Sequence, residues 1–348
     1  MSRKRVAIIG ASGLVGQRFC QLLSNHPFFE EPDLFAWERS DNRKLEEILR
    51  VPSNTISDSL LEKHITLMDA GRINSGKYDA IFSAIPSSKD NNIELELLKS
   101  GNRIFTNSST NRMLDTVPIV VPEINSEHME MFRDQKGYII ANGNCSTIGL
   151  AIPLKPLLPL EPEHIEVTTM QALSGAGYPG VPSLDAVSNM VPFIESEEEK
   201  IQRELPKVLG ALNGNKITPR NIDMGVTCTR IPVREGHTES ISVRFSRNIE
   251  NEDISGLLSE FRAYPQANRL PSAPSQPIIV SGSEYRPQPE LDLWNGTPER
   301  ARGMAVTVGR IRKTGKYLRF VTLSHNTVRG AAGASVLNAE IAHSRGLL

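Results

Sequence analysis

The residue of this sequence whose type and setting best suit covalent chemistry is Cys145, in the segment ANGNCSTIG. It follows residues 138–141, an apolar run typical of a buried strand, and it precedes an apolar segment that can begin a helix. A thiol at a helix N-terminus is expected to have a lowered pKa, because the helix dipole and free backbone N–H groups stabilise the thiolate. We therefore predict that Cys145 is a nucleophile. We interpret Cys20 and Cys228 as buried, unreactive cysteines, which is also the alternative for Cys145.

A cysteine nucleophile requires a group that moves protons, and His237 has the most suitable setting of the seven histidines. It ends the segment RIPVREGH, which is typical of a strand, a tight turn and a second strand. If the chain turns at residues 233–234, the side chains of Arg230 and His237 lie about 5 Å apart on one face of a hairpin. The pair would offer a cation for an anionic substrate and a base for the thiol. An exposed hairpin histidine without a catalytic role is the alternative.

A glycine-rich loop, GASGLVG, lies between a predicted strand at 5–9 and an amphipathic helical pattern. Glycines in this place permit a tight turn and let backbone N–H groups approach a pyrophosphate at the N-terminus of the helix. The spacing GxxGxxG is a variant of the dinucleotide-binding motif, and a purely structural turn is the alternative. The expected cofactor contacts of this loop are Gly10, Ser12, Gly13, Leu14, Val15 and Gly16.

The choice between NAD and NADP depends on the residues that follow the second predicted strand, 34–37, which are Glu38, Arg39 and Ser40. An acidic residue there binds the adenosine ribose of NAD, whereas arginine and serine can bind the additional phosphate of NADP. Because adjacent strand residues point in opposite directions, only one of Glu38 and Arg39 is expected to meet the ribose. We predict that Arg39 and Ser40 bind NADP, with Lys44 adding positive charge. A solvated charged turn is the alternative.

The order of the predicted elements indicates two domains, and a length of 348 residues lets each bury a core. The first 145 residues alternate short β-rich runs with helical patterns, which predicts a parallel sheet with crossover helices. From about residue 163, long β-rich runs follow one another, which predicts a mainly antiparallel sheet. The strands expected in the first part are 5–9, 34–37, 80–85, 103–106, 118–121 and 138–141, with a helix at 92–100.

Two segments of the second part are less regular. A helix is expected at 197–212, although Pro206 should interrupt or kink it. Residues 271–299 contain six prolines and are expected to form an ordered surface excursion or a subunit contact.

The composition excludes several classes of protein. Lys and Arg total 39 and Asp and Glu total 40, a net charge of -1 that disfavours binding to nucleic acid. No apolar run approaches the roughly 20 residues needed to cross a bilayer. Three cysteines far apart form neither a disulfide framework nor a CxxC metal pair, so we expect a cytoplasmic protein without a metal site.

Five motifs resemble, in order, those of the aspartate-semialdehyde dehydrogenase family, in the branch common in archaea and fungi. They are GASGLVG at 10–16, GNCST at 143–147, QALSGAGYPG at 171–180, RIPVREGH at 230–237 and NTVRGAAG at 326–333. The resemblance implies an α/β protein with a Rossmann-type NADP-binding domain, 1–147, completed by a C-terminal helix at 328–348. It implies a second, α+β domain, 148–327, for catalysis and dimerisation, in a homodimer or homotetramer.

The resemblance also implies a role for each matching residue. Cys145 is the nucleophile, His237 the acid and base, and Arg230 the receptor of the substrate α-carboxylate. Pro206 puts the Glu204–Lys207 pair in doubt, because residues three apart share a helix face only if the helix continues; a solvated charged face is the alternative. The further substrate contacts implied are Arg112 for phosphate, Asn144, Gln171, Glu204 and Lys207. The further cofactor contacts implied are Ser83, Ser174, Gly175 and Asn326.

The implied reaction is the reversible, NADP-dependent conversion of 4-phospho-L-aspartate to L-aspartate 4-semialdehyde and inorganic phosphate, a step toward lysine, threonine, methionine and isoleucine. Cys145 displaces phosphate to form a thioester, which hydride transfer reduces, while backbone N–H groups after Cys145 stabilise the oxyanion. Malonyl-CoA reductase, with the same cysteine and histidine chemistry, is the main alternative. N-acetyl-glutamyl-phosphate reductase and a non-catalytic paralogue are more remote.

Overall fold

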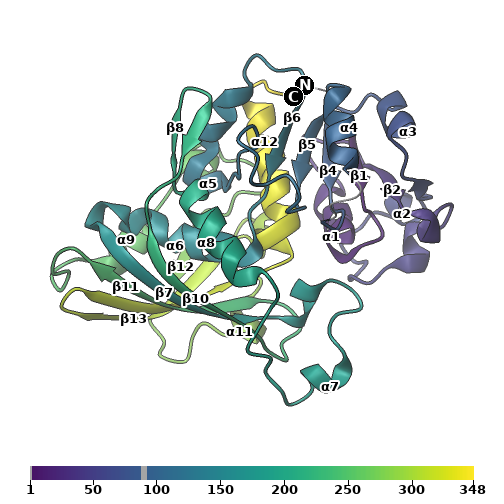
Figure 1. The fold of residues 1–348 in the computed structure, drawn as a ribbon. Helices are drawn as coiled ribbons and strands as arrows, with labels where there is room; N and C mark the ends of the chain where they lie inside the picture. The colour runs from purple at the N-terminus through teal and green to yellow at the C-terminus, as the bar shows by residue number, and fades with distance from the viewer. Residues whose placement is uncertain (1, 88–91) are drawn as a thin grey trace.

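The computed structural model describes residues 2–87 and 92–348, which form two six-stranded sheets with helices packed around them (Figure 1). The first sheet has the order β3-β2-β1-β4-β5-β6, and every neighbouring pair is parallel. Strands such as β1, β4 and β6 are buried along their whole length, as a parallel sheet covered on both faces requires. The strands are β1 (Val6–Ile9), β2 (Asp33–Ala36), β3 (Thr66–Leu67), β4 (Ala80–Ser83), β5 (Arg103–Thr106) and β6 (Tyr138–Ala141).

Helices from both ends of the sequence cover this sheet. The C-terminal helix α12 (Gly333–Ser344) is almost completely buried and packs against α1, α5, β4 and β5 (Figure 1). The other α-helices are α1 (Leu14–Leu23), α2 (Asp58–Leu61), α3 (Ala70–Ser75), α4 (Ile93–Lys99) and α5 (Pro122–Asn125). The 3-10 turns are η1 (Glu38–Ser40), η2 (Leu45–Ile48) and η3 (Ser126–Phe132).

The second sheet has the order β10-β7-β11-β14-β13-β12. The pairs β7–β11, β11–β14 and β13–β14 are antiparallel, whereas β10–β7 and β12–β13 are parallel. The strands are β7 (Pro162–Gln171), β10 (Asp223–Arg230), β11 (His237–Phe245), β12 (Ile278–Val280), β13 (Val306–Thr314) and β14 (Tyr317–Ser324), and β8 (Ala211–Asn213) and β9 (Lys216–Thr218) form a separate hairpin. The expected class, a Rossmann-type domain followed by a domain with a mainly antiparallel sheet, is confirmed.

Two helices lie over one face of the second sheet: α6 (Cys145–Leu154) contacts β11, and α8 (Glu197–Val208) contacts β10 and α6 (Figure 1). The remaining α-helices are α7 (Ser183–Ala186), α9 (Ile254–Ser259), α10 (Tyr264–Ala267) and α11 (Pro289–Asp292). The remaining turns are η4 (Lys155–Leu160), η5 (Leu173–Ala176), η6 (Glu299–Ala301) and the π-helical η7 (Val328–Ala332).

Three expectations about local structure are wrong. Residues 118–121 do not form a strand, because Ile119 makes only an isolated bridge to Ala141. The helix expected at 197–212 ends at Val208, although it does continue through Pro206. Arg230 and His237 are not opposed in a hairpin, because β7 lies between the strands that carry them.

No helix among residues 2–87 and 92–348 is long and apolar enough to cross a membrane.

Candidate active site

The register of the second sheet places four polar side chains side by side at one end. Arg230 on β10 pairs with Gln171 on β7, and His237 on β11 pairs with Ser324 on β14. The pairing of Thr238 with Met170 places His237 across from Gln171. Residues directly opposed on neighbouring strands point to the same face, so Arg230, Gln171, His237 and Ser324 form one row, here called the catalytic row. The hairpin interpretation was wrong in topology, but both residues belong to the same site.

Cys145 is the first residue of α6, as the sequence predicts. Asn144 is the N-cap, and its Oδ1 accepts from the backbone N–H groups of Ser146 and Thr147 at 2.9 and 3.2 Å. Those two donors are therefore not available for an oxyanion, contrary to expectation. Gly330 of η7 packs directly against Cys145, because a Cβ at this position would lie 2.6 Å from the Cβ of Cys145.

The pKa of Cys145 is not lowered as expected. The protein desolvates the thiol although part of the residue is open to solvent, and this burial, with the negative charge of Glu197, raises the pKa to about 12. Arg112, the backbone at Ser146 and Arg230 act in the opposite direction but do not outweigh it. Groups of the free protein alone therefore do not produce a thiolate at neutral pH.

His237 is held as a neutral imidazole. Burial, and then the charge of Arg230, lower its pKa to about 3. Its Nδ1 accepts from the backbone N–H of Ala172 at 3.1 Å, which places the ring proton on Nε2. Nε2 is buried and has no hydrogen-bond partner among the described residues. In this arrangement His237 presents a proton donor to the site.

A loop crosses the catalytic row and closes it on one side. The backbone N–H groups of Leu173 and Ser174 donate to the carbonyls of residues 233 and 234, and the guanidinium of Arg230 donates to the Ala172 carbonyl at 2.7 Å. A Cβ on Gly175 would lie 2.7 Å from Nη1 of Arg230 and 3.2 Å from Nε2 of His237. Gly175 therefore lets the backbone lie against both residues.

Glu204 and Lys207 lie buried on α8, so the alternative of a solvated charged face is wrong. Oε1 of Glu204 accepts from Arg112 at 2.8 Å, and Oε2 accepts from the backbone N–H of Asn144 at 2.6 Å. Nζ of Lys207 donates to the carbonyls of Arg112, Leu114 and Val117 at 2.7 to 2.9 Å. An ammonium has three N–H groups, so all are used. The pair holds the loop 112–117 and the start of α6.

The guanidinium of Arg112 is only partly used by protein groups among the described residues. Nη1 is bound by Glu204, and Nη2 donates to the carbonyl of Asn107 at 2.7 Å. Its Nε is buried without a partner among the described residues.

Glu197 lies beside the site although it was not predicted, and it and Lys200 have the same spacing as the predicted pair Glu204 and Lys207. Its Oε2 accepts from the amides of Asn144 at 2.8 Å and Gln171 at 3.3 Å, and its Oε1 accepts from Lys200 at 2.9 Å. Burial opposes its ionisation, but Lys200 and the two amides outweigh burial and lower its pKa. It is the first of three consecutive glutamates at the start of α8, and that pattern is typical of any helix N-terminus.

A second polar row lies behind the catalytic row. It contains Cys228, Thr169, Glu239 and Thr322. Each lies on the same strand as a residue of the catalytic row, two positions away from it, and therefore points to the same face of the sheet. Glu239 is fully buried beneath α6: a Cβ on Gly149 would lie 3.3 Å from its Oε1, which has no partner among the described residues. Burial raises its pKa well above the usual value, so the carboxyl is neutral.

The glycine loop has the geometry of a dinucleotide site. Gly10 has φ of +83°, and a Cβ there would lie 2.7 Å from the backbone of Ala84. A Cβ on Gly16 would lie 2.2 Å from the carbonyl oxygen of Gly10. Gly13 is the N-cap of α1 and offers no side-chain cap, so backbone N–H groups of the first turn remain for a phosphate. These residues fit a bound dinucleotide.

A groove of about 620 Å³ lies between the start of α1 and residues 173–180, which belong to the loop that crosses the catalytic row, although none of the row's four residues lines it. Its lining combines both domains, including Leu14, Arg50, Ser174, Tyr178 and Trp294. Arg50 stacks on the ring of Tyr178, with 3.5 Å between the guanidinium carbon and the ring centroid.

Two of the expected cofactor residues are bound to protein groups. Asn326 donates to Oγ of Ser174 at 2.8 Å and accepts from the backbone N–H of Gly236 at 2.9 Å, so it fixes two loops. The hydroxyl of Ser83 donates to Glu94 at 2.6 Å inside the first domain.

Arg39 and Ser40 lie in η1 after the end of β2, so the argument from alternating strand residues does not apply to them. Glu38 and Arg39 are both exposed.

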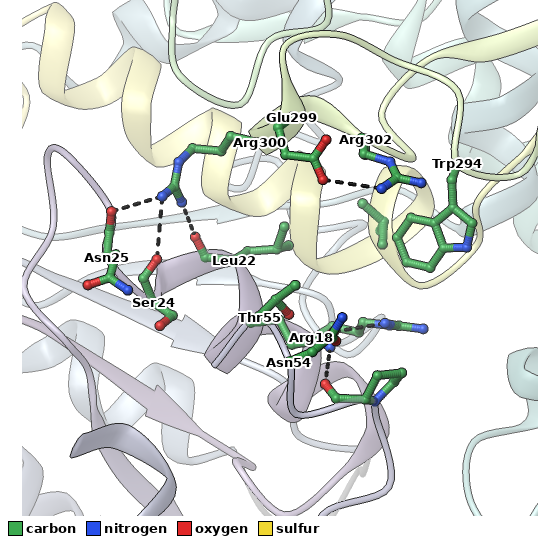
Figure 2. A pocket seen from close by; sticks show the side chains of 13 residues that line it. Arg18, Leu22, Ser24, Asn25, Asn54, Thr55, Trp294, Glu299, Arg300 and Arg302 are labelled. Carbon is green, nitrogen blue, oxygen red and sulfur yellow. Dashed lines mark hydrogen bonds and ion pairs between the residues drawn. The ribbon is translucent and has the colours of Figure 1, made fainter. Parts of the chain in front are cut away.

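A second cavity of about 650 Å³ lies at the C-terminal end of α1 (Figure 2) and adjoins the groove, with which it shares Arg18, Pro52 and Trp294. Arg300 there donates to the carbonyls of Leu22, Ser24 and Asn25, and Arg302 pairs with Glu299 (Figure 2). Its arginines are thus bound to protein groups, and Cys145 does not line it.

The fold and the site define a nucleotide-dependent enzyme with a cysteine at a helix start beside the catalytic row, and comparisons with known proteins specify the family. A family profile described as "Semialdehyde dehydrogenase, NAD binding domain" matches residues 5–132, and one described as "Semialdehyde dehydrogenase, dimerisation domain" matches residues 154–329. The chain therefore belongs to the semialdehyde dehydrogenase family.

Individual relatives support the same assignment. The aspartate-semialdehyde dehydrogenase of Archaeoglobus fulgidus is 41% identical, over 97% of this chain and 98% of the relative. A crystal structure of the Candida albicans aspartate semialdehyde dehydrogenase with NADP has a TM-score of 0.88 and 34% identity, over 99% of this chain and 100% of that one. A malonyl CoA reductase (NADP) of Metallosphaera sedula is 34% identical, over 99% of this chain and 98% of the relative. The resemblance inferred from the five motifs is confirmed.

Proposed function

We propose that this protein catalyses the NADP-dependent, reversible conversion of 4-phospho-L-aspartate to L-aspartate 4-semialdehyde and phosphate. The observation that carries the proposal is the meeting of a cysteine at a helix start with Gln171, Arg230 and His237 in one row of the second sheet. In cells this reaction leads toward lysine, threonine, methionine and isoleucine.

Each residue of the site is assigned one role in the proposed reaction. Sγ of Cys145 attacks the acyl carbon and phosphate leaves, which gives a thioester on the enzyme. NADPH, when bound along the groove, supplies the hydride. The resulting thiohemiacetal collapses to the aldehyde and releases the thiol. Arg230 holds the α-carboxylate, and Nε of Arg112 is the donor proposed to bind the phosphoryl group.

The oxyanion of each tetrahedral species requires donors other than the first N–H groups after Cys145. Asn144 occupies the N–H groups of Ser146 and Thr147. Nε2–H of His237 is buried and unpartnered among the described residues, and it is the donor that we assign to the oxyanion. Collapse of the tetrahedral oxyanion after hydride transfer re-forms the carbonyl and expels the sulfur of Cys145 as a thiolate, which takes up a proton from solvent, so the ring keeps its Nε2 proton.

The remaining assignments are the residues that we propose to contact NADP. The loop from Gly10 to Gly16 holds the pyrophosphate, Gly175 lines the nicotinamide end, and Arg39 with Ser40 binds the 2′-phosphate. Asn326 donates a hydrogen bond to Ser174, and this bond fixes the loop at the nicotinamide end.

The decisive assay follows NADPH formation from aspartate semialdehyde, NADP and phosphate, with arsenate as a substitute for phosphate. We expect NADPH to form only when phosphate or arsenate is present. The parallel assay offers malonyl-CoA and NADPH. Oxidation of NADPH by malonyl-CoA, without phosphate-dependent turnover of the semialdehyde, would reject the proposal and leave the thioester chemistry.

We further propose that the protein is a homodimer or homotetramer, through the domain that matches the dimerisation profile. Residues 178–194 extend away from the second sheet (Figure 1) and expose large apolar side chains, with Leu184 88% and Phe193 62% exposed. Light scattering after size-exclusion chromatography measures the assembly. A wild-type monomer at micromolar concentration would reject this proposal.

A further inference from the structure

We propose that Arg18 is a positioning residue, which holds the helix of the cofactor site, α1, in register with the two groups that act on the acyl carbon, His237 and Cys145. It acts through two neighbours, Glu235 and Thr327. The inference rests on the proposed function, because it concerns the transfer of a hydride between groups that belong to different domains.

Arg18 lies where the two domains meet. It is on α1, one helical turn after Leu14, and both residues line the groove at the start of this helix. The side chain of Arg18 is only 4% exposed, and its guanidinium carbon lies 5.4 Å from the ring centroid of Trp294 in the second domain. A buried guanidinium is costly unless its N–H groups have partners, so the partners of Arg18 show what the residue holds.

Three N–H groups of Arg18 have partners among the described residues. Nη1 donates to Gln21 on α1 itself at 2.8 Å, whereas Nη2 donates to Oε1 of Glu235 at 2.6 Å and Nε donates to the hydroxyl of Thr327 at 3.1 Å. The hydroxyl of Thr327 donates in turn to the same Oε1 of Glu235 at 3.3 Å. A planar guanidinium holds its donors at fixed angles, so Arg18 fixes Glu235 and Thr327 relative to α1 and to each other.

The contact with Glu235 leads to His237, two residues further along the chain. Between them, Gly236 has φ of +100° and donates its backbone N–H to Oδ1 of Asn326 at 2.9 Å. Asn326 directly precedes Thr327, so two consecutive residues hold the segment 235–236. Nε2 of His237 has no partner among the described residues, and its position therefore depends on how the backbone at the start of β11 is held.

The contact with Thr327 leads to Cys145. Thr327 is the N-cap of η7, and Gly330 of the same turn packs against Cys145. The backbone N–H of Gly330 donates to the carbonyl of His325 at 2.9 Å, and η7 also packs against α1. A displacement of Thr327 relative to α1 would therefore move the wall that lies against Cys145.

A second arginine joins the same helix to the second domain without this connection. Arg300 donates to the carbonyls of Leu22, Ser24 and Asn25 at the C-terminal end of α1 (Figure 2). None of these three residues adjoins Cys145 or His237 in the sequence. Arg300 is therefore a matched control: it has the same side chain, the same helix and the same two domains, but it holds the opposite end of α1.

Hydride transfer requires accurate placement across the two domains. The first turn of α1 is the proposed pyrophosphate site, whereas Cys145 and His237 are proposed to hold the acyl carbon and its oxygen. A misplacement of about 1 Å between reacting atoms can cost roughly 100-fold in rate. Arg18 is one turn from the pyrophosphate site and hydrogen-bonds to a neighbour of each reacting group, so its loss should affect the rate rather than the affinity.

The first test compares Arg18→Met with Arg300→Met. We expect Arg18→Met to lower kcat about 10- to 100-fold, while the Kd for NADP, measured by calorimetry, and KM for aspartate semialdehyde change less than about threefold. Arg300→Met should change each of the three values less than about threefold. Arg18 also lines the groove, and a direct contact with NADP would weaken binding instead. A raised Kd with near-normal kcat would overturn the positioning role.

A double-mutant cycle tests whether Arg18 acts through Glu235. Glu235→Gln is measured alone and together with Arg18→Met, and the double variant leaves no unpaired charge in place of the ion pair. Because both changes break one contact, the double variant should lose about as much kcat as Arg18→Met alone. Losses that multiply would overturn the proposal.

A conservative variant keeps the test valid if Arg18→Met does not fold. Arg18→Lys retains the charge but not the fixed pair of donors, so it should lower kcat at least about threefold. A wild-type kcat in Arg18→Lys would also overturn the proposal.

A second readout needs neither cofactor nor turnover. The rate at which iodoacetamide alkylates Cys145 in the free protein is followed by mass spectrometry of its peptide. Thr327→Val removes the hydroxyl that Arg18 holds and keeps the branched shape of the side chain. We expect alkylation about threefold faster, or more, in Arg18→Met and in Thr327→Val, because a displaced η7 exposes the thiol. Arg300→Met should react like the wild type. Equal rates in all four proteins would overturn the connection to Cys145.

The outcomes separate the two proposals. A wild-type protein that does not turn over aspartate semialdehyde with phosphate overturns the proposed function, and the alkylation rates still test Arg18 on the free protein. An active wild type whose Arg18 and Arg300 variants lose kcat equally would show that both arginines only hold the domains together. That result overturns the positioning role alone.

Discussion

The cofactor end and the catalytic end of the groove are constructed in different ways. At the cofactor end, one continuous stretch, residues 10–17, supplies a turn, a helix start and backbone donors. At the catalytic end, single side chains arrive from β7, β10, β11, α6 and α8, and they meet only because the sheet order brings them together. Function at the first end depends on backbone shape, and function at the second depends on long-range packing. Single substitutions should therefore have different signatures at the two ends.

The largest effect is expected from Cys145→Ser. The hydroxyl is nearly isosteric, but at neutral pH it is a much weaker nucleophile than a thiolate, so kcat should fall at least several hundredfold, about 4 kcal/mol. The affinity for NADP, measured by titration calorimetry, should remain within about twofold. A serine variant with a near-normal rate would contradict the covalent mechanism.

The next effect concerns the two arginines of the catalytic end. Arg230→Ala should raise KM for the semialdehyde about 10- to 100-fold and leave KM for phosphate nearly unchanged, because only the carboxylate meets this side chain. Arg112→Ala should do the reverse. Because removal of Arg112 leaves Glu204 as a buried unpaired charge, the informative variant is Arg112→Ala combined with Glu204→Gln. Equal effects of both arginines on both substrates would refute separate receptors.

A smaller effect is expected at the cofactor end from Arg39→Ala. Arg39 is exposed, so loss of its contact with the 2′-phosphate should raise KM for NADP by about tenfold and change KM for NAD little. Initial rates with both cofactors measure this. Equal changes would show that Arg39 does not bind the phosphate, and a wild-type preference for NAD would favour Glu38 instead.

The smallest effect on the rate, with a measurable effect on stability, is expected from Glu239→Gln. The folded protein keeps this carboxyl protonated, whereas the unfolded chain ionises it near 4.5, the ordinary pKa of a glutamate side chain. The unfolded state therefore binds fewer protons above that pH, and wild-type stability should fall as pH rises. Glutamine removes this dependence, so the stability advantage of the variant should be small at about pH 4.5 and should grow toward pH 8 by about 1.4 kcal/mol for each pH unit over which the folded carboxyl stays protonated. Urea titrations at both pH values test this. A stability difference independent of pH would contradict a neutral Glu239.

The two ends also differ in how far the sequence predicts them. The glycine loop, the strands around it and the helix start at Cys145 follow from local pattern, because their function depends on neighbours in the chain. The structure brings Arg230 and His237 into one row, but the prediction paired them in a hairpin, since nothing within residues 230–237 reveals that β7 inserts between them. Glu197 was missed for a related reason. A run of three glutamates indicates a helix start, and only packing distinguishes the first from the third.

Electrostatics was the least predictable feature. The sequence places Cys145 at a helix start, which favours a thiolate, but burial and Glu197 reverse the direction. Likewise, Glu204 and Lys207 have the residue types of a substrate receptor, yet both oxygens of Glu204 and all three N–H groups of Lys207 already have protein partners. The charge of a side chain is read from sequence, whereas its remaining capacity to bind depends on the tertiary structure.

The contact between Gly330 and Cys145 has a consequence for the order in which the protein is made. The ribosome adds Cys145 well before Gly330, the residue that packs against it. Helix α12, which packs against the first sheet, is made after Gly330. A nascent chain therefore carries the thiol without its final wall until residue 330 has been added. The site is complete only when this late segment returns to a cysteine made long before it.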